Sequence, residues 1–187
     1  MSTSSIRSCE ALCALVATGH RPKYVCFWGH TSSTDGAVTK ACFSQWYASP
    51  FEVDDVVYPT AEHFMMAGKA RLFADDVALR QVLAAPNPGA VKAIGRSIEG
   101  FDEKVWQERR WDIVVQANLA KFSQNAALAE FLRNTGASVL VEASPVDKIW
   151  GIGLAADDPD AENPAGWQGL NLLGFALMEV RSRLAYA

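Results

Sequence analysis

The segment TAEHFMMAGKARLF, residues 60–73, carries a carboxylate and an ammonium at a spacing that suits acid–base chemistry. Glu62 and Lys69 are seven residues apart, so in a helix they fall within about 20° of each other, two turns apart along one face. Met65 and Met66 lie between them. Apolar side chains flanked by opposite charges perturb both pKa values, as general acid–base or amine catalysis requires. The alternative is that the methionines are ordinary core residues and the two charges lie at the rim of that core.

A second cluster lies in EASPVDKIWGIG, residues 142–153, where Asp147 and Trp150 precede two glycines. A carboxylate beside an indole can hold a polar ring system by stacking together with a hydrogen bond. The glycines allow a ligand or another stretch of backbone to approach closely. A solvated turn aspartate and a core tryptophan are the competing interpretation.

The long segment 103–122 is typical of one helix, most of whose apolar residues have the spacing of a core face. Trp111, which has charged neighbours, would instead line a pocket. Arg96 follows a short helical segment, and its guanidinium can hold phosphate oxygens bidentately. Core packing for the tryptophan and a surface position for the arginine are the alternatives.

Composition and charge exclude several classes of protein. The chain has 187 residues, half of them apolar, and a formal net charge of −4, which fits about one domain with a real core. The negative charge argues against the broad basic surface of a non-specific nucleic-acid binder. The three histidines form no pair at metal-ligand spacing, and no serine-hydrolase elbow, P-loop or dinucleotide fingerprint occurs. We therefore expect neither a metal nor a cofactor.

Four cysteines lie in the first quarter of the chain without a Cys-x-x-Cys pair, so we expect reduced thiols. The apolar stretch 11–17 is too short and too acidic at its start for a signal peptide. No run approaches the ~18 apolar residues of a membrane span. These features predict a cytoplasmic protein with no membrane partner.

Helix signals dominate the chain, and Thr60, Asn87 and Asp102 are available as caps. The predicted helices cover residues 5–18, 61–73, 75–84, 88–95, 103–122, 125–134 and 170–185. The predicted strands cover residues 24–28, 43–47, 138–142 and 148–152, together with a hairpin at 51–59 that turns at Asp54 and Asp55.

These elements predict an α+β fold, a single compact and mostly helical domain with a small mixed β-sheet. Alternating β–α units are absent from the pattern, which argues against a doubly wound parallel sheet. Residues 1–22 are expected to form an N-terminal helical extension and residues 23–187 the main domain. The polar loop 155–169 has a length that is usually kept for binding.

Several of these segments, taken in order, resemble the NADAR family, also called YbiA-like proteins. The motifs are CFWG, CFSQWYASPF, YPTAEHFMMAGKA, the tryptophan and KF of the long helix, LVEASPVDKIWGIG and GLNLLGFALMEVR, between Tyr24 and Leu184. The resemblance implies a mostly helical α+β fold and N-glycosidase activity, the cleavage of the bond between ribose C1 and a nitrogen. Some members act on ribosylamino-pyrimidine phosphates, which are early riboflavin-biosynthesis intermediates, and others remove ADP-ribose from guanine bases.

Carried over position by position, the resemblance implies catalytic roles for Glu62, Lys69 and Asp147. The family commonly has Ser-Asn-Phe where this chain has Ser44, Gln45 and Trp46, and we expect the longer glutamine side chain to alter the pocket near the ribose. With Arg96 as the phosphate clamp, the substrate-binding candidates are Ser44, Trp46, Arg96, Trp111, Trp150 and Asn171.

Two mechanisms fit these residues. Departure of the base from C1 builds oxocarbenium character, which Glu62 or Asp147 can stabilise while a carboxylate activates water for direct attack. Alternatively, Lys69 attacks the opened sugar aldehyde and forms a transient Schiff base. We favour this second mechanism for an ADP-ribosyl substrate, because the resemblance places the lysine where carboxylates can shuttle its protons.

A non-catalytic module that binds ADP-ribose or a nucleotide is the alternative function. The joint presence of Glu62, Lys69 and Asp147 favours the enzyme, since a pure binder needs no lysine with a tuned pKa. The predicted partner is a small phosphorylated ribosyl-nucleobase or ADP-ribose substrate. An ADP-ribosylated nucleic acid is a further candidate, because a glycosidase acting at a strand end needs only a few contacts.

Overall fold

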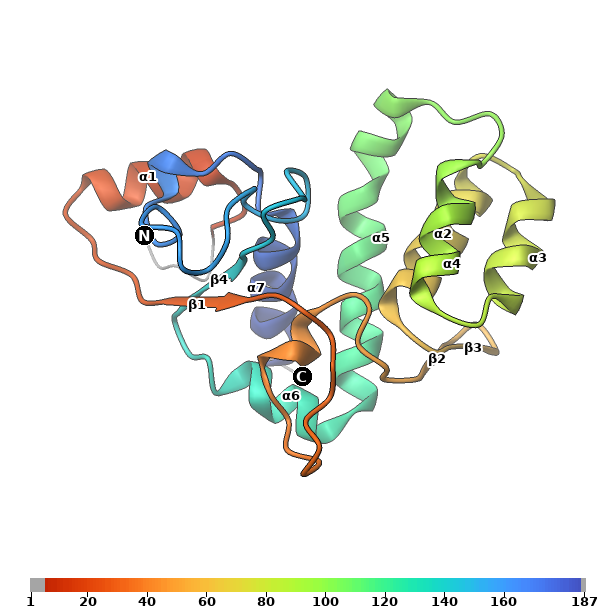
Figure 1. The fold of residues 1–187 in the computed structure, drawn as a ribbon, viewed down its shortest axis with the longest axis horizontal. Helices are drawn as coiled ribbons and strands as arrows, with labels where there is room; N and C mark the ends of the chain where they lie inside the picture. Colours follow the sequence, from red (N-terminus) through yellow and green to blue (C-terminus); the bar gives the residue numbers. More distant parts are fainter. Residues whose placement is uncertain (1–5, 186–187) are drawn as a thin grey trace. The chain divides into compact units, whose positions relative to one another are not determined.

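Helices dominate the chain in the computed structural model, which describes residues 6–185 (Figure 1). The described residues group into two compact units. Unit 1 contains the residues up to Ser44 together with those from Ala126 onward, and unit 2 contains the continuous segment Gln45–Asn125. Unit 1 is therefore built from two stretches of chain that flank unit 2 in the sequence.

Each helix of unit 2 begins at a side chain that caps it. An oxygen of the capping side chain accepts a hydrogen bond from a backbone N–H of the first turn, which has no partner within the helix. The caps are Thr60, Asp75, Asn87 and Asp102. The elements of unit 2 are β2 (Phe51–Val53), β3 (Val56–Tyr58), α2 (Ala61–Leu72), α3 (Asp76–Ala84), α4 (Pro88–Arg96) and α5 (Glu103–Gln124).

The hairpin of unit 2 turns at Asp54 and Asp55, whose φ angles are 53° and 60°. Two successive residues in this left-handed conformation give a turn whose twist matches that of paired strands, and aspartate tolerates the conformation better than most residues. β2 pairs antiparallel with β3, and the rings of Phe51 and Tyr58 stack with centroids 5.8 Å apart. The Tyr58 ring meets Phe64 of α2 edge-on at 4.9 Å, which fastens the hairpin to the helix.

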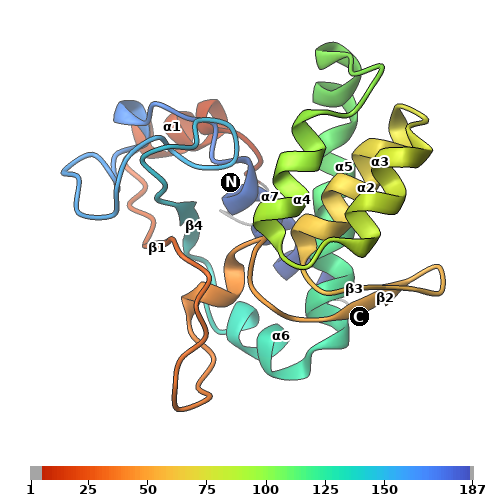
Figure 2. The same cartoon turned by 45° about the vertical axis from the view of Figure 1, so that its right-hand side comes forward.

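α2 is the central helix of unit 2, and α3, α4 and α5 all pack against it (Figures 1 and 2). Met65 and Met66 are buried in this packing. Gly95 of α4 lies directly against the Met66 side chain, where a Cβ atom would collide with the sulfur. The two methionines are therefore core residues, as the alternative interpretation of this helix face predicts.

Unit 1 contains two parallel strands with the last helix packed against one of them (Figure 1). β1 pairs with β4 so that Tyr24 lies opposite Val139 and Phe27 lies opposite Glu142. α7 packs against β4 and is buried along most of its length. The elements of unit 1 are α1 (Cys9–Ala17), β1 (Tyr24–Phe27), η2 (Lys40–Phe43), α6 (Ala126–Arg133), β4 (Val139–Glu142), η3 (Pro164–Gly166) and α7 (Leu172–Leu184).

Asn171 joins the start of α7 to β4. Its side chain is fully buried, and its φ angle is 51°. Its Oδ1 accepts from the backbone N–H of Glu142, and its Nδ2 donates to the carbonyl of Leu140, each at 2.9 Å. Gly174 lies against the same Leu140 carbonyl, where a Cβ atom would collide. The helix and the strand therefore approach more closely than a side chain at this position would allow.

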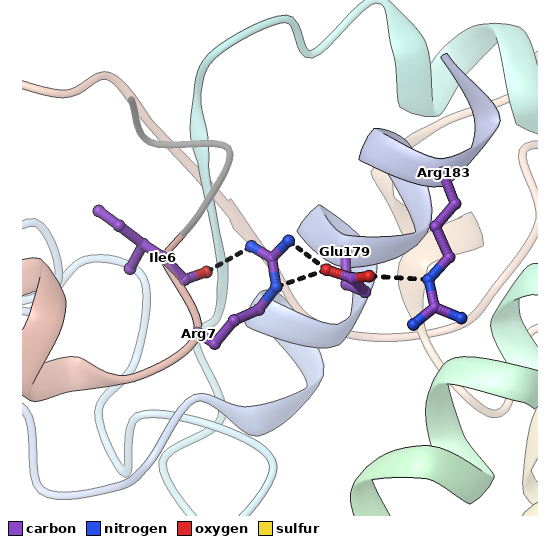
Figure 3. Close-up of polar contacts among 4 residues, drawn as sticks. All are labelled: Ile6, Arg7, Glu179 and Arg183. Atoms are coloured by element: carbon purple, nitrogen blue, oxygen red, sulfur yellow. Dashed lines mark hydrogen bonds and ion pairs between the residues drawn. The ribbon is translucent and has the colours of Figure 1, made fainter. Parts of the chain in front are cut away.

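Arg7 ties the N-terminal segment to Glu179 of α7, and the same carboxylate also pairs with Arg183 one turn further along that helix (Figure 3). The Nε of Arg7 donates to Oε2 of Glu179 at 2.6 Å, and the Nε of Arg183 donates to Oε1 at 2.7 Å. Burial raises the pKa of the Glu179 carboxyl, but the two arginines outweigh this effect and leave the pKa below its usual value. Ile6 is also buried, so the segment before α1 packs within unit 1.

The predicted fold class is confirmed, since the chain is α+β and mostly helical. Parallel and antiparallel pairing both occur, in two separate two-stranded sheets. Two predicted strands are wrong. Segment 43–47 instead ends η2 and continues as a turn, because Thr39 caps a 3-10 helix just before it. Segment 148–152 is irregular, because Asp147 captures the N–H groups of Ile149 and Trp150 that a strand would need.

The other predicted elements are present with slightly shifted ends. All four cysteines are free thiols, as expected, and burial raises the pKa of the Cys9 thiol to about 11. Residue 5, where the first helix is predicted to begin, lies outside the described residues. The boundary after residue 22 stays a prediction.

Candidate functional site

Glu62 lies in the first turn of α2, two residues after the cap Thr60. The residue is only 3% exposed. Its backbone N–H donates to the carbonyl of Gln45 at 3.0 Å, which ties the segment before the hairpin to the start of the helix. The N-terminus of a helix stabilises negative charge. The Glu62 carboxyl group therefore lies at the end of α2 that interacts favourably with an anion.

The side chain of Gln45 forms a buried pair with the side chain of Asn118. Gln45 is 6% exposed and Asn118 of α5 is fully buried. The Nδ2 of Asn118 donates to Oε1 of Gln45 at 2.8 Å and to the carbonyl of Val114 at 2.9 Å. Because a carbonyl can only accept, Val114 sets the orientation of the Asn118 amide and, through it, that of Gln45.

This orientation leaves the Nε2 of Gln45 and the Oδ1 of Asn118 buried with no hydrogen-bond partner among the described residues. An unpaired buried polar atom costs about 1–3 kcal/mol, so a donor and an acceptor left in this state are candidates for binding a ligand. Asn118 is not among the site residues predicted from the sequence. Gln45 is mentioned there only because it differs from the residue that the family commonly has. Only its position on the inner side of a long helix, one turn after Val114, marks Asn118 in the sequence.

Lys121 is a second buried polar residue that is absent from the predicted site residues. It lies on α5 one turn beyond Asn118 and is fully buried. Its Nζ is 5.6 Å from the centre of the Tyr47 ring and 5.3 Å from that of Phe122, at distances where aromatic rings stabilise a cation. The KF pair of the long helix belongs to the motifs of the resemblance, but periodicity alone does not show that its ammonium is buried.

Lys69 lies two helical turns beyond Glu62 on α2, about 10 Å along the axis. Its Nζ donates to the carbonyl of Gly95 at 2.7 Å. The same atom lies 4.1 Å from the centre of the Phe101 ring and 5.6 Å from that of Trp106. Burial lowers the pKa of this lysine against the opposing effect of nearby negative charge. The amine is therefore held against α4 and loses its proton more readily than an ordinary lysine.

The remaining predicted residues of unit 2 are Trp46, Arg96 and Trp111. Trp46 is half-buried, and the Nζ of Lys92 lies 5.8 Å from its ring centre. Trp111 is half-buried on α5, so one part of its indole packs while another part stays accessible. Arg96 is the exposed last residue of α4, where a cation also complements the helix dipole. Their roles toward a substrate stay predictions.

His63 is buried beside Glu62 in sequence, and both of its ring nitrogens have partners. Its Nε2 lies 3.3 Å from the carbonyl of Ala85 and its Nδ1 lies 2.8 Å from Oγ1 of Thr60. Because the carbonyl can only accept, the neutral ring carries its proton on Nε2 and accepts from the threonine hydroxyl at Nδ1. Burial lowers the pKa of His63, although the Ala85 carbonyl opposes the shift.

In unit 1, Asp147 forms a turn with its own backbone. Its Oδ1 accepts from the N–H groups of Ile149 at 2.9 Å and Trp150 at 2.8 Å. A Cβ atom at Gly151 would lie 2.8 Å from the carbonyl oxygen of Glu142. Gly151 therefore lets another stretch of backbone approach closely. The sequence predicts that the glycines admit either a ligand or a stretch of backbone, and Gly151 admits backbone. Asp147 and Trp150 are both half-buried, and their predicted catalytic and binding roles stay predictions.

The other predicted residues of unit 1, Ser44 and Asn171, also form hydrogen bonds with backbone groups. Ser44 follows η2, and its N–H donates to the carbonyl of Ala41 at 3.1 Å. The amide of Asn171 is bonded to β4 through both of its polar atoms. These contacts describe what the two residues do for the fold, and their roles in substrate binding stay predictions.

The predicted site residues fall into two groups, and each group contains one carboxylate. Those of unit 2 are Trp46, Glu62, Lys69, Arg96 and Trp111, and those of unit 1 are Ser44, Asp147, Trp150 and Asn171. Among residues 6–185, no cluster of three or more His, Cys, Asp or Glu side chains is arranged to hold a metal ion. Over the same residues, we find no helix with the length and apolar character needed to span a membrane.

Known proteins are similar to this chain in sequence and in fold. A family model for the NADAR domain matches residues 26–185. The chain is 38% identical over 164 residues to N-glycosidase R617 of Acanthamoeba polyphaga mimivirus, a match that covers 85% of this chain and 95% of the relative. It is 32% identical over 143 residues to N-glycosidase YbiA of Escherichia coli K12, covering 76% of this chain and 81% of the relative. The NMR structure of E. coli YbiA matches with a TM-score of 0.70 at 28% identity, covering 89% of this chain and 88% of that chain.

The fold and these relatives define the class of protein: a mostly helical α+β enzyme that hydrolyses N-glycosyl bonds. Within that class, the chain belongs to the NADAR family.

Proposed function

We propose that the chain hydrolyses the bond between ribose C1 and nitrogen in a phosphorylated ribosylamine or an ADP-ribosyl nucleobase. The observation that carries this proposal is the presence on one helix, α2, of a buried carboxylate, Glu62, and of Lys69, an amine whose pKa is lowered by burial. A module that only binds needs no such pair. Relatives named as N-glycosidases support a reaction at a glycosidic nitrogen.

A carboxylate has a clear use in this hydrolysis. The C1–N bond breaks, the nitrogen keeps the electron pair and gains a proton, and the hydroxyl of water is added to C1. Positive charge builds on C1 and the ring oxygen as the bond breaks, so a nearby carboxylate lowers the barrier. Glu62 is our candidate for this role, because a charge acts more strongly where water is excluded. We assign Asp147 the role of a second carboxylate that exchanges protons with the reacting groups.

For an ADP-ribosyl substrate we favour a route through Lys69. The bond between C1 and the ring oxygen breaks, the oxygen gains a proton, and the base nitrogen loses its own proton as it forms a C=N bond to C1. The amine of Lys69 then adds to C1 and passes its two protons to the base nitrogen, which leaves as the free amine of the base, so that a C=N bond now joins lysine and sugar. Water then adds to the C=N bond, the lysine leaves as the free amine, and the sugar aldehyde recloses. The lowered pKa increases the fraction of unprotonated amine near neutral pH. The hydrogen bond from Lys69 to Gly95 must open first.

The other predicted residues would hold the substrate. An exposed guanidinium such as that of Arg96 matches phosphate oxygens, and half-buried indoles offer a face on which a base can stack. The proposed substrate-binding set is Ser44, Trp46, Arg96, Trp111, Trp150 and Asn171. No cofactor enters this reaction.

Two substrate classes meet these requirements, ribosylamino-pyrimidine phosphates of riboflavin biosynthesis and ADP-ribosyl-guanine, free or in a nucleic acid. A mass-spectrometric cleavage assay on both, run side by side, tests the proposal. Release of ribose 5-phosphate alone assigns the enzyme to the first class, and release of ADP-ribose alone assigns it to the second. Cleavage of neither by the folded chain contradicts the proposal.

Glu62→Gln separates an enzyme from a binding module in the same assay. The substitution keeps the size of the side chain and removes its charge, so we expect cleavage to fall by about 10²–10⁴-fold while substrate binding is kept. Glu108→Gln, an equal loss of charge at an exposed position on α5, is the matched control and should cleave normally. Unchanged turnover by Glu62→Gln would remove this residue from the mechanism.

A further inference from the structure

The Gln45–Asn118 pair presents two buried polar atoms that the fold itself does not use. The Nε2 of Gln45 can only donate, and the Oδ1 of Asn118 can only accept. Both side chains are more than nine-tenths buried, and the contact of Asn118 with Val114 fixes which atoms remain. The pair therefore calls for a ligand group that accepts one hydrogen bond and donates another.

A sugar hydroxyl has this chemistry at a single oxygen. A phosphate dianion or a carboxylate has no proton to donate to Asn118, and an ammonium has no lone pair to accept from Gln45. An amide edge of a nucleobase also offers both functions, but the position of the pair favours the sugar. The backbone carbonyl of Gln45 accepts a hydrogen bond from the backbone N–H of Glu62. Glu62 is the residue whose carboxylate we propose stabilises the positive charge at C1.

We infer that Gln45 and Asn118 bind the hydroxyl on the ribose carbon next to C1 and thereby select ribosyl over 2-deoxyribosyl substrates. This inference rests on the proposed function and deepens it, since ribose is common to both proposed substrate classes. Hydrogen bonds to this hydroxyl strengthen as the glycosidic bond breaks, so the same contact also favours the reaction. A substrate without the hydroxyl would leave both amide atoms buried and unpaired, which is the strongest form of discrimination against a missing polar group.

Binding of two sugar phosphates to the full chain tests the inference without any need for turnover. The probes are ribose 5-phosphate and 2-deoxyribose 5-phosphate, and the measurement is the dissociation constant of each by isothermal titration calorimetry. We expect the wild-type chain to bind ribose 5-phosphate at least about 10-fold more tightly. Gln45→Leu, which has a similar volume and no amide, should bring the ratio of the two constants close to one, mainly by weakening the ribose compound.

Gln124→Leu is the matched control. Its amide is hydrogen-bonded too, in this case to the backbone N–H and carbonyl of Glu52, but it lies at the exposed end of α5. This variant should keep the wild-type ratio. If Gln45→Leu fails to fold, as judged by circular dichroism, Gln45→Asn takes its place. It keeps an amide but is one methylene shorter, and a lowered ratio is expected.

The inference would be overturned by equal affinity of the wild-type chain for the two sugars, by no binding of either, or by a ratio that the folded Gln45 variant leaves unchanged. Affinities for base-modified nucleosides provide a further test. If affinity depends on the base and not on the sugar hydroxyl, the inference is wrong and the Gln45–Asn118 pair binds the base. Failure of the proposed function is a separate result. In that case the chain discriminates between the sugars but cleaves neither proposed substrate class.

Discussion

The amide of Asn171 bonds to β4 on both sides at once, accepting from the N–H of Glu142 and donating to the carbonyl of Leu140. Its backbone has a φ angle of 51°, a conformation that asparagine tolerates better than most other residues. An asparagine thus combines the required backbone with one donor and one acceptor in a short side chain. In unit 1 this residue is a structural link, whatever it contributes to substrate binding.

Asn171→Leu should destabilise the chain strongly. The substitution leaves two backbone groups of β4 without their partners and places a branched side chain at positive φ, so we expect the free energy of unfolding to fall by about 2–5 kcal/mol. Urea denaturation followed by circular dichroism measures this loss. Asn163→Ala removes an exposed amide bonded to Asp160 in the same unit and should change stability by no more than about 0.5 kcal/mol. Similar losses in the two variants would show that the link to β4 contributes little.

Lys69 should be the residue trapped when borohydride is added during cleavage of an ADP-ribosyl substrate. Reduction of the C=N bond would leave the sugar attached to the protein, and intact-protein mass with peptide mapping would locate it. Lys69→Arg keeps a donor for the carbonyl of Gly95 but cannot form the C=N bond, so we expect no adduct and a loss of activity of at least about 100-fold. Normal turnover by the wild-type chain without any adduct would instead support direct attack by water.

Two substitutions at Asp147 distinguish the contribution of its negative charge to the reaction from the contribution of its hydrogen bonds to the turn. Asn at this position keeps an Oδ1 that can accept from Ile149 and Trp150, whereas Ala removes the acceptor. If the carboxylate exchanges protons in the reaction, Asp147→Asn should fold like the wild type and lose about 10²–10⁴-fold in kcat. Asp147→Ala should lose activity and also melt at a lower temperature. A fully active Asp147→Asn variant would leave the residue with a role in the turn alone.

His63 should make the stability of the chain depend on pH. Burial lowers its pKa in the folded chain, while the unfolded chain keeps a value of about 6.5. Between these two values the unfolded state binds more protons, so the free energy of unfolding is highest above about pH 6.5 and falls as the pH drops toward the folded pKa. In urea titrations from about pH 7.5 to about pH 5, His63→Gln should lose this part of the pH dependence. His20→Gln, at an exposed position, should keep it, and an unaltered profile in His63→Gln would count against a buried neutral ring.

Chemistry between close neighbours in the sequence explains which parts of the fold were predictable. Thr60, Asn87 and Asp102 cap the helices that follow them, and each side chain accepts from an N–H three residues further along the chain. The hairpin turn at Asp54 and Asp55 is equally local. These signals do not depend on what packs around them.

The sequence-based predictions are wrong or incomplete where tertiary contacts, or local hydrogen bonds that compete with a strand, determine the structure. The segment after Asp147 has the composition of a strand, but the aspartate side chain takes two of its N–H groups. Gln45 and Asn118 meet across a long sequence separation, so no local pattern shows their contact. The burial of Lys121 likewise depends on a tyrosine from a distant part of the chain. Buried polar residues of this kind are visible only once the fold is known.

The parallel pairing of β1 with β4 also dictates an order of assembly during synthesis. The whole of unit 2 lies between the two strands in the sequence, so the ribosome has completed unit 2 before Val139 exists to pair with Tyr24. If unit 2 folds as it emerges, its residues no longer add flexible length to the loop that this pairing must close, which lowers the entropic cost. Until then β1 carries an unpaired edge, the kind of surface on which nascent chains associate with one another. A chain that stalls before β4 would keep that edge exposed.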